Sequence, residues 1–292
     1  MAISAAEVKK LREKTGAGMM DCKRALEEAG GDFEKAVDIL RKKGLAAAQK
    51  KSARVAAEGM AIAKSRGDLG VALEVNSETD FVARNELFQS FVQQLADLIL
   101  DKQPKDLAEL KALPFAEGRT VEEATVELIA KIGENIQIRR FAVLSGDHVA
   151  SYVHMGGKIA VLVAFAGEVD PQLARQIAMH VAAANPKYLD RESVPEEDLA
   201  REREVLLEQA RATGKPEHVL EKIVEGRLRK FYEENCLLEQ AFVVDPDKKV
   251  ADVLGDARIT GFVRYQLGEG IEKQADDFAA EVAAQAGLKG SR

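Results

Sequence analysis

The chain of 292 residues has no tryptophan, only two cysteines and no long apolar run. Cys22 and Cys236 are too few for a disulfide framework and lack the CxxC spacing of a zinc site. The longest apolar stretch, residues 159–166, is far shorter than the roughly 20 residues that span a bilayer. Glu7 and Lys9 leave no apolar signal-peptide region near the N-terminus. We therefore expect a cytoplasmic protein without a membrane span.

Motifs for catalysis or nucleotide binding are also missing. The two Gly-Lys pairs, at 157–158 and 214–215, have Tyr152 and Gln209 where a phosphate-binding loop requires glycine. The four histidines show no paired metal-ligand spacing. The sequence therefore predicts a protein that is not an enzyme, holds no metal or cofactor and does not bind nucleotide directly.

Charge is divided unevenly along the chain. Residues 1–57 carry 13 Lys and Arg against 8 Asp and Glu, whereas the rest carries 29 against 41. The net charge is −7 and aromatic residues make up only 5%. An acidic body argues against a protein that coats nucleic acid. The basic N-terminal part leaves one alternative open, an adaptor that binds RNA through this segment.

The N-terminal part of the sequence predicts three short helices. Ser4 is followed three residues later by Glu7, the spacing of a capping box. We expect Asp21 to cap the second helix, and Asp32 and Gly44 to begin and end the third. The Ala- and Lys-rich stretch that follows is interpreted as a helical or flexible linker.

Alternating apolar residues then predict a unit of strand, strand, helix and strand over residues 58–144. Its first two strands flank a turn at 66–68, and its helix carries apolar residues at helical spacing between Phe88 and Ile99. Thr120 and Glu123 are expected to cap a further helix that ends at Gly133, and the last strand covers 136–142. A second unit with the same order of elements is predicted over 149–267. We interpret the two as an internal duplication.

The second unit contains a long insertion, residues 186–232. Its strands are predicted at 149–154, 159–166 and 259–267, and its helix begins at Asp170, with a proline next to it.

Within the insertion, Ser193 and Pro216 are expected to begin two charged helices that form an antiparallel hairpin. A hairpin of this size buries little by itself, so self-association is predicted. A short amphipathic helix is predicted at 276–286.

The segment between the second strand and the following helix, residues 76–85, carries the most information about function. One interpretation is local: Thr79 or Asp80 caps the helix, and Phe81 or Val82 packs onto the core. The other is an exposed tip made of Asp80 and Phe81 that inserts into a partner. A carboxylate next to an apolar ring suits a site where a cation and a hydrophobic slot lie side by side.

Six stretches of the chain resemble the bacterial translation elongation factor Ts family. The long and specific ones are residues 11–26 (LREKTGAGMMDCKRAL) and 74–83 (EVNSETDFVA). Shorter matches are 131–140 (KIGENIQIRR), 177–183 (IAMHVAA), 268–273 (GEGIEK) and 277–282 (DFAAEV).

The resemblance implies an α+β fold in five parts, with a duplicated α/β core of two subdomains. These parts are a three-helix ubiquitin-associated-like domain and linker (1–55), a core N-subdomain (56–144), a core C-subdomain (145–185 and 233–270), a helical-hairpin dimerisation insertion (186–232) and a C-terminal helical module (271–292).

The resemblance also implies a function, guanine nucleotide exchange on elongation factor Tu, in its GDP-bound and nucleotide-free states. Thr79, Asp80, Phe81 and Val82 match the segment that dislodges Mg²⁺ from that partner. Lys23, His154 and His180 match further partner contacts.

Overall fold

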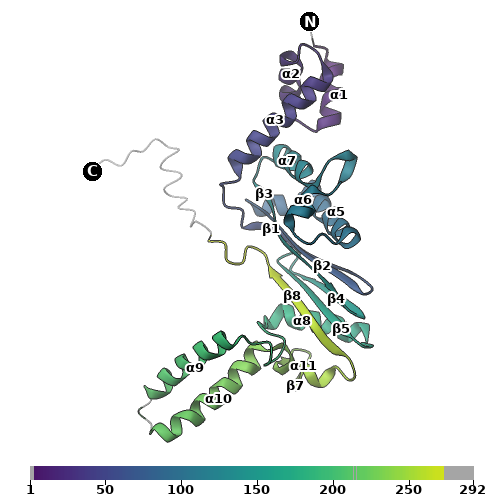
Figure 1. Ribbon diagram of the computed structural model, residues 1–292. Coiled ribbons are helices and arrows are strands. Elements are labelled where there is room, and N and C mark those ends of the chain that lie inside the picture. The colour runs from purple at the N-terminus through teal and green to yellow at the C-terminus, as the bar shows by residue number, and fades with distance from the viewer. Residues whose placement is uncertain (1–2, 213, 215, 273–292) are drawn as a thin grey trace, which may run out of the picture.

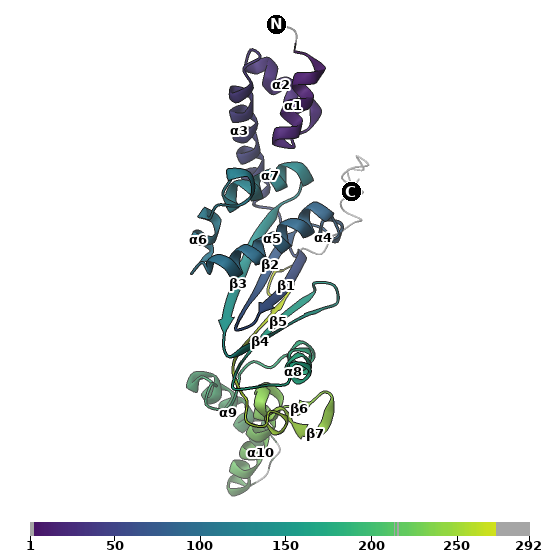
Figure 2. The same ribbon diagram turned by 90° about the vertical axis from the view of Figure 1, so that its right-hand side faces the viewer.

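The computed structural model describes residues 3–212, 214 and 216–272 of the chain. It is an elongated molecule, with a helical module at one end, a helical hairpin at the other and two β-sheets between them (Figure 1). A view at right angles shows the same order along the long axis (Figure 2). The mixed α+β class expected from the sequence is confirmed.

Three helices form the N-terminal module: α1 (Ala5–Thr15), α2 (Met19–Glu28) and α3 (Phe33–Lys51). The predicted capping box of Ser4 and Glu7 is present at the start of α1. The prediction that Asp21 caps α2 is wrong, because the helix begins earlier, after Gly18. Asp21 lies in its first turn and pairs with Arg24 at 2.6 Å. The module has its own small core, formed by Val8, Leu11, Cys22, Ala25, Leu26 and Ala36.

Helix α3 does not end at Gly44 but continues to Lys51, so the predicted boundary is wrong. Its second half packs against α7 (Val121–Ile132). Arg41 forms an ion pair with Glu123 of α7, and Ala48 is buried in the core of the first sheet. A glycine inside a helix costs about 1 kcal/mol relative to alanine, which these tertiary contacts outweigh. The N-terminal module is therefore joined to the core by a continuous helix.

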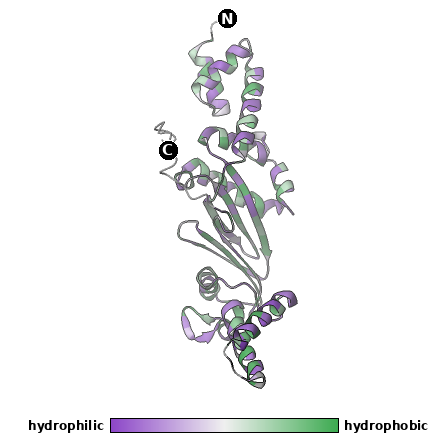
Figure 3. Ribbon diagram, turned by 90° about the vertical axis from the view of Figure 1, so that its left-hand side faces the viewer, coloured by the Kyte–Doolittle hydropathy of each residue, from purple (hydrophilic) through white to green (hydrophobic). Residues whose placement is uncertain are grey.

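Two three-stranded antiparallel sheets form the middle of the molecule. The first contains β1 (Glu58–Arg66), β2 (Leu69–Ser77) and β3 (Ile136–Ser145). The second contains β4 (His148–His154), β5 (Ile159–Ala166) and β8 (Arg258–Gln266). In each sheet the middle strand is the second in sequence, and every strand expected from the alternating pattern is present. Figure 3 shows hydrophobic residues concentrated on these strands.

Helices cover the outer face of each sheet. Leu73 and Val75 of β2 point toward Phe88 and Leu95 of α5 (Glu86–Lys102) in one core. Val161, Val163 and Phe165 of β5 pack with Ile177 of α8 (Pro171–Ala184) in the other. The capping box of Thr120 and Glu123 begins α7, and Asp170 caps α8, as their spacing predicts.

The inner faces of the two sheets pack directly on each other. Ala72 of β2 meets Val149, Leu162 and Ala164 of the second sheet. The approach is close at Gly70, where a Cβ atom would lie only 2.6 Å from Cγ1 of Val149. Small residues on β2 therefore allow the two sheets to form one body of four layers, helix, sheet, sheet and helix.

A buried carboxylate, that of Glu74, joins the two sheets at one end of this interface. Its Oε1 accepts hydrogen bonds from Arg139 Nη1 (2.9 Å) and the backbone N–H of Gly268 (2.9 Å), and its Oε2 accepts one from Arg140 Nε (2.6 Å). Successive strand residues normally point to opposite faces. Here a β-bulge pairs Glu74 with Arg140 and Val75 with Ile138, so that Arg139 is an extra residue and both guanidinium groups reach the same carboxylate.

Glu74→Gln should destabilise the protein by about 2–3 kcal/mol near neutral pH, because both arginines lose their anionic partner. Burial opposes ionisation, but the hydrogen bonds from Gly268, Arg139 and Arg140 outweigh it and lower the pKa of Glu74. The contribution of the carboxylate is therefore complete above its ordinary pKa of 4.5 and is lost as the pH falls through the lowered value. Urea unfolding of both proteins over a pH series measures this, and a difference that stays constant into acid would contradict it.

The hairpin consists of α9 (Glu196–Arg211) and α10 (Glu217–Asn235). Ser193 does not cap α9 as predicted: its hydroxyl accepts from Asp190 N, and the N-cap position is Pro195. The two helices share a narrow apolar seam formed by Leu206, Ala210, Leu220, Val224 and Leu228. Most of the surface of the hairpin outside this seam is polar. The hairpin projects from the core as a thin arm (Figure 1).

Several short elements were not predicted from the sequence. They are α4 (Asp80–Ala83), α6 (Leu107–Ala112), α11 (Val250–Val253), the 3₁₀ turns at Ala116–Gly118 and Leu237–Glu239, and the small hairpin of β6 (Ala241–Phe242) and β7 (Asp245–Lys249). The predicted helix at 276–286 lies outside the described residues. Within the described part of the chain, no helix has the length and apolar character needed to cross a membrane.

Candidate functional site

The residues of the predicted tip lie where β2 ends and α5 has not yet begun. They form α4, a single helical turn. The side chain of Phe81 is 79% exposed, whereas the next residue, Val82, is 6% exposed and belongs to the core of the first sheet. The turn therefore buries Val82 and presents the larger ring of Phe81 to solvent, where a partner can reach it.

The local interpretation holds only for Val82, which packs onto the core. Thr79 occupies the N-cap position of α4 but makes no capping hydrogen bond with its side chain. The cap of α5 is Asn85, whose Oδ1 accepts from the N–H groups of Leu87 and Phe88. The prediction that Thr79 or Asp80 caps this helix is therefore wrong.

Asp80 lies next to a basic residue on the surface. Its carboxylate is 3.2 Å from Arg84 Nη2, one helical turn later. Both side chains are well exposed, and exposed ion pairs contribute little to stability. The carboxylate can therefore exchange Arg84 for another cation at small cost.

The backbone around α4 is held by residues that follow α7. Glu134 accepts hydrogen bonds from the backbone N–H of Thr79 (3.0 Å) and from its hydroxyl (2.7 Å). In the opposite direction, Glu78 Oε1 accepts from the backbone N–H of Asn135 at 2.5 Å. Residues 78–79 and 134–135 thus bind each other through a reciprocal pair of side-chain-to-backbone contacts.

His154 lies at the end of β4, exposed, with its Nδ1 3.0 Å from the hydroxyl of Tyr152. The next residue, Met155, is 72% exposed and has a left-handed backbone, with φ of 49°. The turn is fixed to β1, because Ala61 N donates to Gly157 O at 2.8 Å. α4 also contacts β1, and Figure 2 shows α4 and the β4–β5 turn on the same side of the molecule.

His180, predicted as a direct partner contact, is fully buried on α8. Its Nδ1 accepts from Val243 N (3.3 Å), so its Nε2 donates to Gln240 Oε1 (2.8 Å). In this structure the ring offers no surface to a partner, and its role is corrected to an internal one: it connects α8 to the β6–β7 hairpin. The neighbouring side chains of Met179, Val243 and Val244 are the exposed ones.

Burial lowers the pKa of His180, and the hydrogen bond to Gln240 only partly opposes this. The unfolded chain takes up a proton below about pH 6.5 while the folded protein resists it, so stability should fall as the pH drops below that value. His180→Gln should remove part of this slope, as measured by chemical denaturation between about pH 7 and pH 5. If the variant does not fold, NMR titration of the wild-type imidazole gives the same information, and a pKa at or above 6.5 would contradict the account.

Lys23 is half-exposed on α2, 3.8 Å from Glu27, and remains available to a partner. The same helix begins with two exposed methionines, Met19 and Met20. Two consecutive apolar side chains at the start of a predicted helix are the sequence signal that marks this exposed position. Met155, beside His154, is another exposed methionine.

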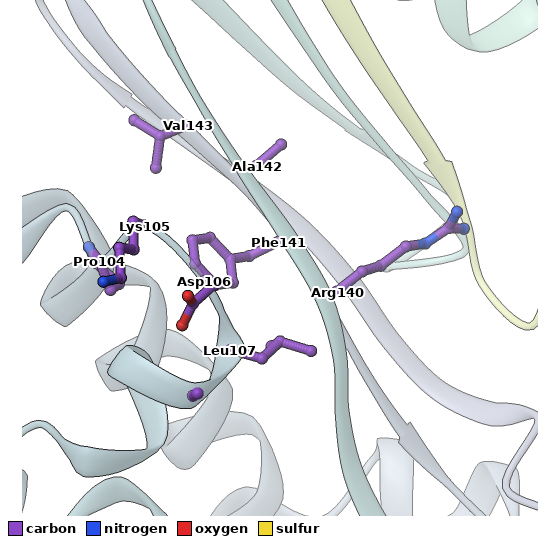
Figure 4. A pocket seen from close by; sticks show the side chains of 9 residues that line it. Pro104, Lys105, Asp106, Leu107, Arg140, Phe141, Ala142 and Val143 are labelled. Carbon is purple, nitrogen blue, oxygen red and sulfur yellow. The ribbon is translucent and has the colours of Figure 1, made fainter.

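The described part of the chain offers no cluster of side chains for a metal ion. No group of three His, Cys, Asp or Glu side chains converges there. The hollow between α6 and β3 is broad and open (Figure 4). Its acid, Asp106, caps α6, and Arg140 points away from it toward β8.

One comparison with known proteins identifies a relationship. A family model described as "Elongation factor TS" matches residues 78–269. The match begins at the segment that carries the tip and includes β3 of the first sheet, the whole second sheet and the hairpin.

Proposed function

The chain belongs to the elongation factor Ts family, whose members are nucleotide exchange factors for elongation factor Tu rather than enzymes, and from this premise we propose how it acts. It binds elongation factor Tu in its GDP-bound form and directs the tip, Asp80 and Phe81, toward the site of the nucleotide-bound Mg²⁺. Mg²⁺ is displaced, GDP leaves, and the nucleotide-free complex then accepts GTP. This exchange takes place in the cytoplasm, where translation elongation occurs.

The exposure of Phe81 is the observation that carries the proposal. A phenylalanine ring left in water on a folded protein gains its hydrophobic free energy only when a partner covers it. The ring stands on one turn whose other apolar side chain, Val82, is anchored in the core. Such a ring enters an apolar slot without much further loss of conformational freedom.

Asp80 supplies the second part of the mechanism. Oxygen ligands bind Mg²⁺ in a demanding octahedral geometry, so a carboxylate brought close to the ion disturbs its coordination. Mg²⁺ bridges the partner and the phosphates of either nucleotide, so its loss weakens GDP and GTP alike.

Thermodynamic linkage then sets the direction of exchange. If this protein weakens nucleotide binding, nucleotide weakens the binding of this protein by the same factor. An increase of about 10⁴ in the rate of GDP release requires about 5.5 kcal/mol, within reach of an interface of ordinary size. The protein therefore sets the rate, and an excess of GTP over GDP sets the direction.

The remaining predicted residues are assigned to docking. Lys23 and the basic N-terminal module would approach an acidic face of the partner, where charge mostly accelerates association. His154 would contact the partner from the β4–β5 turn, and His180 would act indirectly by holding the β6–β7 hairpin. The alternative, an adaptor that binds RNA through the N-terminal module, has no support beyond the positive charge.

Phe81→Ala should slow GDP release by more than about tenfold, because truncating a ring buried in an interface commonly costs about 3 kcal/mol. Asp80→Ala should slow it less. The matched control is Leu87→Ala, since Leu87 is also exposed (55%) and stands nearby at the start of α5. The measurement is release of labelled GDP from elongation factor Tu, with thermal unfolding of each variant recorded alongside.

An unchanged melting temperature with a large loss of exchange in the Phe81 variant alone would support the proposal. Reduced stability with normal exchange at low temperature would contradict it. If the wild-type chain itself does not accelerate release, the proposed function is wrong.

We also propose that the insertion, residues 186–232, mediates self-association and takes no part in exchange, and that the two sheet units derive from duplication. The hairpin is far from α4 along the molecule, at the opposite end of the core (Figure 2). Its apolar seam is narrow and its outer faces are charged, so it contributes little to the core.

Replacement of residues 202–228 by a short Gly/Ser linker should convert dimers to monomers and leave the exchange rate largely unchanged. This deletion keeps the contacts at the base of the hairpin, such as the hydrogen bond from Tyr188 to Asp198. Light scattering measures the loss of the dimer, and GDP release measures the exchange rate. A wild-type monomer, or a folded deletion variant without activity, would show that the assignment is mistaken.

A further inference from the structure

We propose that Glu134 is a positioning residue for nucleotide exchange, which acts by holding α4 so that Phe81 is presented in one orientation. The inference rests on the proposed function, because it assigns a role in the same reaction to a residue outside the tip. Glu134 is 55 positions away from Thr79 in sequence, and the fold brings the two into contact.

Helix α4 cannot hold its own shape. It has four residues, and its N-cap residue makes no side-chain capping bond. Helix nucleation is unfavourable, so an isolated turn of this length is not stable in water. The conformation that exposes Phe81 must therefore be imposed by neighbouring elements.

Glu134 supplies this support from a rigid frame. It follows Gly133, which ends α7 in a left-handed conformation (φ 90°), and it precedes the buried Asn135 and strand β3. Each carboxylate oxygen of Glu134 accepts one hydrogen bond from Thr79, so the N–H and the hydroxyl are both held. Hydrogen bonds to a charged acceptor are stronger than neutral ones.

Other contacts hold the middle and the far end of α4, so the start of this turn depends most on Glu134. Val82 anchors the middle of the turn in the core, and Gln89 Nε2 donates to Ala83 O (3.1 Å) at its far end. At the near end, the hydroxyl of Ser77 donates to Thr79 O (3.0 Å). Without Glu134 the N–H and hydroxyl of Thr79 lose their acceptor, and the start of α4 is held only by Ser77 and by the contact of Glu78 with Asn135, so it moves more.

A mobile α4 lowers the fraction of molecules in which Phe81 is ready to insert, and the rate of the step that needs it falls by the same fraction. Docking through the N-terminal module and the β4–β5 turn does not require α4. Loss of Glu134 should therefore lower the maximal exchange rate rather than raise the half-saturating concentration.

The test is release of labelled GDP from elongation factor Tu over a range of concentrations of the full chain. Glu134→Ala should reduce the maximal rate by at least about tenfold, because it removes two charge-assisted hydrogen bonds and one alone is worth about that factor. Glu134→Gln keeps one acceptor oxygen and should recover part of the rate. Glu122→Ala is the control, since Glu122 is exposed on the first turn of α7, the helix that precedes Glu134.

A double variant distinguishes positioning from a general structural role. If Glu134 acts through the ring, Glu134→Ala should slow exchange little further when Phe81→Ala is already present. Full additivity, a rise in half-saturating concentration alone, or a loss that follows the melting temperature would overturn the inference. So would normal exchange by the folded Glu134→Ala variant. Failure of the proposed function is recognised separately, because wild type would then not accelerate release.

Discussion

The fold depends on one buried interaction, the carboxylate of Glu74 between two β-sheets. A buried charge is costly unless it is paired and hydrogen-bonded, and here a β-bulge at Arg139 directs two guanidinium groups to it. The backbone N–H of Gly268 adds a contact from the end of β8, and Arg140 stacks on Tyr265 of the same strand, 4.3 Å from the ring centre to the guanidinium carbon. The small residues Gly70 and Ala72 let the inner faces of the two sheets meet, but their packing contacts have no preferred direction. The charged junction fixes the register of one sheet on the other and thus the relative position of everything attached to them.

The surfaces assigned to function are attached to this frame at separate points. Strand β2 contains Glu74 and ends at Ser77, immediately before the residues that lead into α4. The β4–β5 turn, with His154, is held against β1 by the backbone contact between Ala61 and Gly157. The N-terminal module is joined through α3 and its packing on α7, the same helix that leads to Glu134. A protein that works by contact alone needs these surfaces at fixed distances, since rigid presentation reduces the entropy lost on binding.

Local rules in the sequence predicted the elements, and contacts distant in sequence decided the details. The capping boxes at Ser4 and Thr120, the Asp170–Pro171 helix start and the six main strands follow from short-range spacing, and all are present. The end of α3 was wrong because packing on α7 outweighs the local penalty of Gly44. The cap of α5 was misplaced because Thr79 binds Glu134, a residue no local rule connects to it. The buried ring of His180 is satisfied by Gln240, 60 positions later, so its motif alone could not distinguish a surface contact from an internal one.

The central claim is that the tip is held in place before any partner binds. Amide hydrogen exchange of the free protein tests it directly, because the account assigns the N–H of Thr79 to Glu134 and the N–H of Asn135 to Glu78. Both amides should exchange far more slowly than in an unstructured peptide, and Glu134→Ala should release the first while leaving the second protected. Exchange of Thr79 in the wild-type protein at the rate of an unstructured chain would contradict the account.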